Sequence, residues 1–136
     1  MLNALMRIGI VRMSFSDSDS LLRHSATELA ALIQQRKLTS TAVVSAYLAR
    51  IETLNPSINA LVQVCAQAAL ADAWAADRAL AQGECRGPLH GVPFTVKDVI
   101  DTRGVVSAAG LTERADYLPE QDAVVVTRIK AAGAIL

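Results

Sequence analysis

Aromatic residues are scarce in this sequence, and neither sign of charge is in excess. Phe, Trp and Tyr make up 4% of the 136 residues, and 13 Lys and Arg residues balance 13 Asp and Glu residues. A surface that binds nucleic acid needs a basic field and, for single strands, aromatic rings on which bases stack. The composition offers neither, so we expect no direct nucleic-acid partner.

Cysteine is also scarce, and no long hydrophobic run is present. Cys65 and Cys85 are too far apart for a CxxC pair or a zinc site and too few for a disulfide framework, which favours reduced thiols and a cytoplasmic location. Arg7 and Arg12 interrupt the apolar opening before a segment of secretory length forms. Because no run approaches the length of a membrane span, we expect no membrane association.

The short motifs that bind common cofactors and metals are missing. The sequence contains no G-x-G-x-x-G, no G-x-x-x-x-G-K-[ST], no H-E-x-x-H and no carboxylates with the spacing of a metal loop. We therefore expect neither a cofactor nor a metal ion.

Hydrophobic residues make up 52% of the chain, which is ample for the packed core of one domain. The small polar residues 14–20 predict that residues 1–23 form a flexible leader or an upstream extension, with Met13 as an alternative start. The folded portion is then expected over residues 24–136.

Apolar residues recur at helical spacing in the first half of this portion, and alanine enriches the third segment. We expect helices from Ser25 or Thr27 to about Lys37, from the polar residues 39–41 to Asn55–Pro56, and from Ala66 to Ala81. Tyr47 and Trp74 lie on the apolar stripes of these helices, so both are expected in the core.

Strand patterns follow each of the longer helices. Residues 58–64 alternate, and residues 92–96 form a short β-branched and aromatic run typical of a central strand. Asp122 is expected to cap a last helix that closes at Gly133, and residues 134–136 to begin a second, parallel strand. These patterns indicate an α/β fold.

Lys97 directly follows the expected strand 92–96. Burying an ammonium group is costly, so a lysine there either pairs with a carboxylate or loses its proton, and a neutral amine can act as a base. Pattern alone leaves two structural alternatives open, in which Lys97 ends a strand in solvent or pairs with Asp98 or Asp101.

The segments 87–110 and 122–136 resemble the amidase-signature family. The family's lysine strand has the form G-[IV]-P-x-x-[VI]-K-D, which Gly91, Val92, Pro93, Val96, Lys97 and Asp98 match. The likeness extends from about Ser25 to Leu136. It implies the N-terminal portion of a single α/β/α layered domain, incomplete as given, with opening helices and the first strands of a mixed sheet.

The resemblance also implies a reaction. Enzymes of this family hydrolyse carbon-nitrogen amide bonds with a Ser-cisSer-Lys triad, in which Lys97 would be the general base. The two serines belong to a GGSSGG-type segment that does not occur in these residues. The 136 residues alone are therefore expected to be inactive, whereas the full-length parent would act on a small-molecule amide.

Several nearby residues depart from the family pattern or invite a role. The family's threonine pair is Ser107-Ala108 here, and its following serine is Leu111; Ser107 is expected to be a turn hydroxyl rather than a nucleophile. Asp98 is a candidate for orienting Lys97 or the glycine-rich loop. His90 is expected to be structural.

Two other functions fit the same residues. The A subunit of a glutamyl- or aspartyl-tRNA amidotransferase resembles simple amidases across this region. A non-catalytic interaction module derived from an amidase N-terminus is the second alternative. Such a module must cover the apolar end formed by Ile135 and Leu136 by itself or by forming a homo-oligomer.

Overall fold

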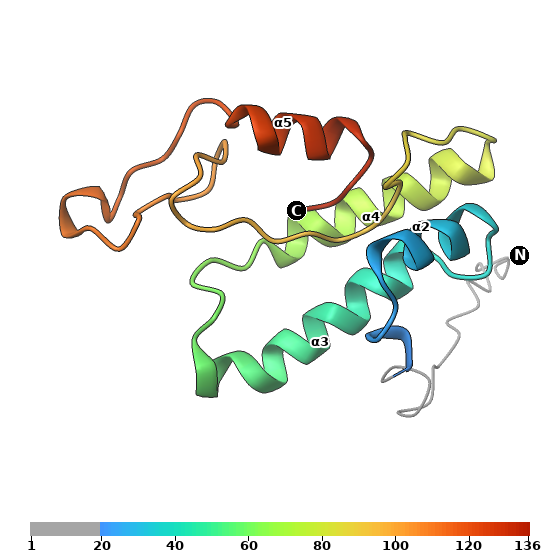
Figure 1. The fold of residues 1–136 in the computed structure, drawn as a ribbon, viewed down its shortest axis with the longest axis horizontal. Coiled ribbons are helices and arrows are strands. Elements are labelled where there is room, and N and C mark those ends of the chain that lie inside the picture. The colour runs from blue at the N-terminus through green and yellow to red at the C-terminus, as the bar shows by residue number, and fades with distance from the viewer. Residues whose placement is uncertain (1–19) are drawn as a thin grey trace, which may run out of the picture.

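A computed structural model describes residues 20–136, which fold into a bundle of helices joined by long connections (Figure 1). The helices are α2 (Ala26–Gln34), α3 (Ser40–Ile58), α4 (Ala66–Ala81) and α5 (Val124–Ala131), with a short 3₁₀ helix at Thr112–Arg114. Most of the expected leader lies outside the described residues. Leu21, however, is already buried in the core.

The expected start of α2 is confirmed, with Ser25 as the cap. The Ser25 hydroxyl accepts a hydrogen bond from the backbone N–H of Glu28, and the Glu28 carboxylate accepts one from the backbone N–H of Ser25 at 2.7 Å. This capping box satisfies donors that a helix start leaves unpaired. The backbone and hydroxyl of Ser25 also lower the pKa of Glu28.

The second expected helix is confirmed, but its predicted end at Asn55–Pro56 is wrong. Pro56 lies inside the last turn of α3, which continues to Ile58 and ends at Asn59 with a left-handed φ of 46°. A proline removes one N–H donor, so the Glu52 carbonyl four residues earlier loses its helical partner; Glu52 is exposed, and water can bond to this carbonyl. Asn59 then closes the helix by donating its N–H to the Asn55 carbonyl at 2.7 Å.

The strand expected at residues 58–64 is also wrong. The Asn55 side chain donates to the Leu61 carbonyl at 2.8 Å and accepts from the Leu61 N–H at 2.9 Å. These bonds occupy the backbone groups of Leu61 that a neighbouring strand would otherwise pair with. The chain therefore crosses from α3 to α4 as an irregular segment.

The predicted helix α4 is confirmed from Ala66 to Ala81, and its alanine face packs against α3. In the view of Figure 1, α4 lies between α3 and α5. The buried positions of α4 are Ala69, Ala73, Ala76 and Ala79. Small side chains on this face allow the two helices to approach closely.

The assignment of Trp74 to the core is wrong, whereas Tyr47 does pack against it. Trp74 is 56% exposed, and the Arg78 guanidinium lies over its ring at 4.7 Å. Helical periodicity shows which residues share a face of α4, and the alanine face, not the Trp74 face, meets α3. Tyr47 is partly buried and packs against the buried side chains of α2 and α3.

The segment 92–96 forms no regular strand, and within residues 20–136 the structure contains only isolated β-bridges. Pro93 and Ile135 make one parallel bridge, in which Phe94 N–H donates to the Ile135 carbonyl at 2.8 Å and Ile135 N–H donates to the Val92 carbonyl at 2.9 Å. The expected parallel pairing of 92–96 with 134–136 therefore occurs at this one bridge. The prediction of regular strands at 92–96 and 134–136 is therefore wrong, and one bridge takes their place.

The helix expected after Asp122 is confirmed as α5, but Asp122 does not cap it. The cap position is Ala123, which makes no side-chain bond. The Asp122 carboxylate instead accepts hydrogen bonds from the Arg103 N–H at 2.8 Å and from the Lys130 ammonium at 2.8 Å. Asp122 thus ties α5 to the long connection before it.

Candidate active site around Lys97

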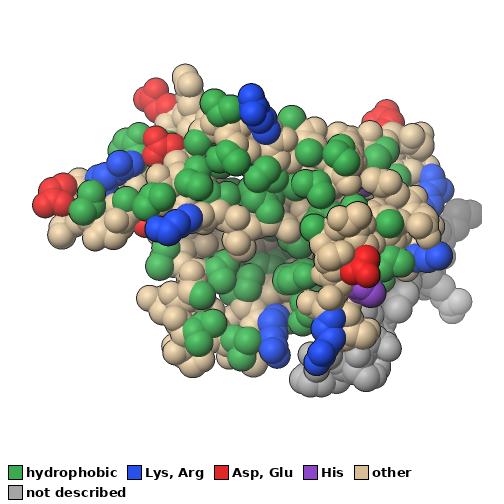
Figure 2. Space-filling model, viewed as in Figure 1, with side chains coloured by type: hydrophobic (Ala, Val, Ile, Leu, Met, Phe, Trp, Pro, Cys, Tyr) green, Lys and Arg blue, Asp and Glu red, His purple; other side chains and the backbone are tan. Residues whose placement is uncertain are grey.

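Lys97 lies on the wall of a cleft of about 830 Å³. One wall is the face of α3 from Val44 to Ile51, and the others are the segments 60–65, 93–98 and 105–107 together with Leu136. Most of the lining side chains are apolar, and Figure 2 shows hydrophobic side chains gathered across one face of the molecule. Lys97 and Asp98 are the charged residues among them.

The Lys97 side chain is exposed and makes no hydrogen bond or ion pair within the described part of the chain. Its backbone carbonyl accepts from the Ile100 N–H at 2.9 Å, which turns the chain directly after it. Of the two structural alternatives that the sequence pattern leaves open, the structure shows the solvent-exposed lysine and not a pair with Asp98 or Asp101. The amine is therefore free to contact a ligand that enters the cleft.

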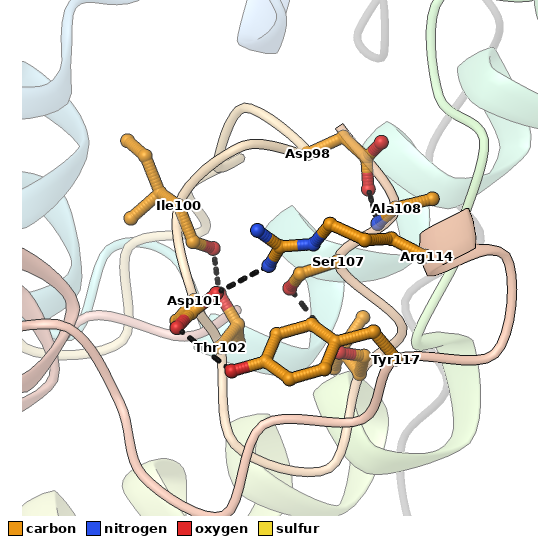
Figure 3. Close-up of polar contacts among 9 residues, drawn as sticks. Asp98, Ile100, Asp101, Thr102, Ser107, Ala108, Arg114 and Tyr117 are labelled. Atoms are coloured by element: carbon orange, nitrogen blue, oxygen red, sulfur yellow. Dashed lines mark hydrogen bonds and ion pairs between the residues drawn. The ribbon is translucent and has the colours of Figure 1, made fainter. Parts of the chain in front are cut away.

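Asp98, beside Lys97, is half-buried and binds backbone. Its Oδ1 accepts a hydrogen bond from the Ala108 N–H at 3.0 Å (Figure 3). Ala108 follows the cleft segment 105–107, so this bond joins two parts of the cleft wall that are ten residues apart in the chain.

Asp101 binds residues further along the connection that leads from Lys97 to α5. Its two carboxylate oxygens accept from the Arg114 guanidinium and from the Tyr117 hydroxyl, each at 3.2 Å (Figure 3). The Arg114 guanidinium also lies over the Tyr117 ring at 4.2 Å. The Asp101 carbonyl accepts from the Ala123 N–H at 2.8 Å, so Asp101 connects this loop to the start of α5.

Ser107 is buried in the turn, as the sequence predicts for a turn hydroxyl. Its Oγ donates to the Val105 carbonyl at 3.3 Å, and its N–H donates to the Tyr117 carbonyl at 3.0 Å. The hydroxyl thus bonds to the backbone of its own turn, and this geometry leaves Lys97 without a serine partner among the described residues.

His90 is fully buried and serves as a structural clamp, in line with expectation. The Arg86 N–H donates to Nδ1 at 3.0 Å, so Nε2 carries the proton and donates to the Ala76 carbonyl at 3.0 Å. His90 thereby joins the Ala76 carbonyl of α4 and the Arg86 amide of the loop, directly before the segment that leads to Lys97. The sequence shows a loop histidine but not these partners.

Asp122 has a perturbed pKa. Burial raises the pKa of this carboxyl, but the hydrogen bonds from Lys130 and from the Arg103 backbone, with the charge of Lys130, hold it below the ordinary value of 3.8. The shift favours the carboxylate form, whose bonds to Arg103 and Lys130 join the connection 103–122 to α5.

The described residues offer no metal centre and no membrane-spanning helix. No three His, Cys, Asp or Glu side chains in residues 20–136 gather as metal ligands, and no helix there is long and apolar enough to cross a bilayer. Cys65 and Cys85 are both free thiols.

Comparison with known proteins places these features in a family. The family model for Amidase matches residues 42–136. AmiD of Mycobacterium tuberculosis is 44% identical over 120 residues, which are 88% of this chain and 25% of AmiD. The A subunit of the glutamyl-tRNA(Gln) amidotransferase of Acidothermus cellulolyticus is 41% identical over 116 residues, which are 85% of this chain and 23% of that relative.

The fold agrees with the sequence match. The crystal structure of the peptide amidase of Stenotrophomonas maltophilia superposes with a TM-score of 0.77 at 34% identity, over 83% of this chain and 23% of that enzyme. The chain thus spans about a quarter of the length of the relatives it matches. With the family match over residues 42–136 and this shared fold, the chain belongs to the amidase family, the amidase-signature enzymes.

Proposed function

We propose that the polypeptide containing these residues hydrolyses a carbon-nitrogen amide bond of a small molecule, with Lys97 as its general base. The observation that supports this most directly is the Lys97 side chain, which lines a largely apolar cleft and has no carboxylate partner. An ion pair with Asp98 or Asp101 would favour the charged amine and weaken it as a base. In the structure, Asp98 accepts from the Ala108 N–H, and Asp101 accepts from Arg114 and Tyr117.

In the proposed reaction, neutral Lys97 removes a proton from a nucleophilic serine through a second serine, and the serine attacks the amide carbonyl. The same route returns the proton to the leaving amine, and water then releases the acyl group. Neither serine of this triad lies in residues 1–136. We therefore propose that these residues alone are inactive.

We also propose an α/β/α layered domain for the whole protein. The parallel bridge between Pro93 and Ile135 supports this proposal, because parallel pairs require a crossover and α5 lies in that connection. Residues 92–96 and 134–136 would then be the first neighbouring strands of its sheet.

The experiment that tests the proposal compares lysine variants of a polypeptide that extends through the serine-bearing segment. Turnover of an acyl-p-nitroanilide should fall by about 10³-fold or more in Lys97→Ala, since triad members act as a unit. Lys37→Ala is the matched control, because Lys37 is also an exposed lysine with no side-chain bond in the described residues. Near-normal turnover by a folded Lys97→Ala variant would falsify the proposal.

A second function, in an amidotransferase, is favoured by the 41% identity to the amidotransferase chain from Acidothermus cellulolyticus. In that case the extended protein should transfer an amide group to glutamyl-tRNA(Gln) only when its partner proteins are added. Hydrolysis of simple amides without such partners, and no transfer in their presence, would decide for the stand-alone amidase.

The interaction-module alternative is tested on residues 1–136 by themselves. The apolar cleft and exposed side chains such as Ile58 and Val62 argue that more polypeptide covers them. A cooperative unfolding transition together with a monomeric solution mass would favour the module. Aggregation or a broad transition would favour the enzyme portion.

A further inference from the structure

The backbone on both sides of Lys97 is held by hydrogen bonds. On its C-terminal side the Lys97 carbonyl accepts from Ile100, and the Asp98 carboxylate accepts from Ala108 at 3.0 Å. On its N-terminal side, the backbone is paired to Ile135 through Val92 and Phe94. The Lys97 side chain itself is held by nothing in the described residues, so its direction depends on these backbone contacts.

The Asp98 contact has a second effect on the cleft. Val105 to Ser107, the segment before Ala108, forms a wall of the cleft that also contains Lys97. Because Asp98 adjoins Lys97 in sequence, its bond to Ala108 sets the separation between the lysine and this wall. The bond has the ordinary N–H···O length of 3.0 Å, and its charged acceptor makes it stronger than a bond to a neutral oxygen.

We propose that Asp98 is a positioning residue for Lys97, acting through the Ala108 backbone. The Asp98–Ala108 contact holds the turn after the lysine segment and so aims the Lys97 amine into the cleft. This inference rests on the proposed amide hydrolysis, in which Lys97 is the base. A base displaced by about 1 Å loses up to about 10²-fold in rate even when the fold is intact.

Asp122 provides a matched comparison within the same connection. Its carboxylate also accepts a backbone N–H, that of Arg103 at 2.8 Å, but it lies outside the lining of the Lys97 cleft. Loss of Asp122 should loosen the connection and α5 without changing the chain next to Lys97. A purely structural role for Asp98 would make the two aspartates equivalent.

The kinetic test uses the extended polypeptide and an acyl-p-nitroanilide substrate. Asp98→Ala should lower kcat by about 10- to 100-fold with KM changed by less than about 3-fold, because the loss concerns the base and not substrate binding. Asp98→Asn retains a carbonyl oxygen at the same place and should recover most of the lost kcat. Asp122→Ala should lower Tm and keep kcat within about 3-fold of wild type.

Hydrogen exchange on the extended polypeptide tests the contact independently of activity. The Ala108 amide should exchange at least about tenfold more slowly than an unprotected amide, and Asp98→Ala should abolish this protection. A wild-type Ala108 amide without protection would overturn the inference even if Asp98→Ala proved too unstable for kinetics. So would an equal loss of kcat in Asp98→Ala and Asp122→Ala.

The outcomes separate this inference from the proposed function. If wild type is active, Lys97→Ala is inactive and Asp98→Ala keeps full kcat, the proposed function stands and the positioning role is wrong. If Lys97→Ala remains active, the proposed function fails, whatever the protection of Ala108.

Discussion

The Asp77 carboxylate of α4 accepts both the backbone N–H and the hydroxyl of Thr41, at 3.0 and 2.6 Å, at the first turn of α3. The same carboxylate also accepts the Ser40 N–H at 2.6 Å. A negative charge at a helix N-terminus satisfies unpaired donors and interacts favourably with the helix dipole. The first turn of α3 is therefore capped from two sides. Its own Thr39 hydroxyl accepts from the Ala42 N–H at 3.1 Å, and Asp77 of the neighbouring helix, 36 residues from Thr41, accepts the preceding N–H groups.

Replacing Asp77 by Ala should destabilise the protein. Partly buried N–H donors would lose a charged acceptor, so we expect a loss of about 1–3 kcal/mol in the free energy of unfolding, measured by urea denaturation. Asp72→Ala is the control, since Asp72 is an exposed aspartate on the same helix and its change should stay within about 0.5 kcal/mol. Equal effects of the two substitutions would contradict the role given to Asp77.

His90→Phe should be more destabilising than a typical surface substitution. Phenylalanine keeps a planar ring but leaves the buried Ala76 carbonyl and the part-buried Arg86 N–H without their partners, and a buried group left unsatisfied costs about 1–3 kcal/mol. His24→Phe, at the other histidine, should have little effect because His24 is 38% exposed. Thermal unfolding of both variants, monitored by circular dichroism, measures the difference. A shift in Tm for His90→Phe no larger than for His24→Phe would show that the clamp contributes nothing.

The sequence predicts most helices because their signals are local. Ser25 and Glu28 form a capping box within one turn, and the alanine run of α4 favours a helix by itself. Which face of a helix is buried depends on the neighbouring elements and not on local sequence. The apolar stripe therefore predicts Trp74 in the core, whereas α4 turns its alanine face to α3 and exposes the ring.

Side-chain to backbone bonds that span several residues explain the other differences. Asn55 binds Leu61 and prevents the expected strand, and Asp122 binds Arg103 and Lys130 instead of capping α5. In the candidate site, the motif around Lys97 is local, so the sequence alone is enough to single out this lysine as a candidate site residue. The Asp98–Ala108 bond joins residues from opposite sides of a turn, so its partner emerges only in the folded chain.

Asp122 should make stability depend on pH below the ordinary aspartate range. Because its pKa is lowered in the folded state, its stabilisation is fully present well above the unfolded value of 3.8 and is lost as pH falls through the folded value. Asp122→Asn should be less stable than wild type at pH 7 by about 1–2 kcal/mol, and this difference should shrink below pH 3.8. Urea denaturation at several pH values measures it. Asp116→Asn, in the exposed part of the same connection, is the control for the change of net charge. A difference that stays constant from pH 7 to pH 2 would rule out this linkage.

Gly91→Ala should be more destabilising than Gly104→Ala. Both glycines have left-handed φ values, 76° and 74°, so alanine pays a similar backbone penalty of about 1–2 kcal/mol at each. Around Gly104 a Cβ atom would meet nothing within 4 Å, whereas at Gly91 it would lie 2.8 Å from the Ser40 Cβ and collide with the Ser40 hydroxyl. Overpacking should add about 1–3 kcal/mol at Gly91. Parallel urea denaturation of the two variants isolates this steric part, and equal losses would contradict the close approach of Gly91 to α3.

Ser40→Ala should stabilise the protein, although it removes a polar group from a fully buried site. The Ser40 Oγ has no hydrogen-bond partner in the described structure, because Gly91 packs directly against it. A buried hydroxyl without a partner costs about 1–3 kcal/mol, and alanine removes that cost while leaving the backbone N–H bonded to Asp77. Alanine is also a better helix former than serine, so Ser45→Ala, at an exposed position of α3, provides the correction for propensity. The gain in the free energy of unfolding should be about 1 kcal/mol larger for Ser40→Ala than for Ser45→Ala. A loss of stability in Ser40→Ala would mean that the hydroxyl has a partner, such as a buried water molecule, at the junction between α3 and the segment that leads to Lys97.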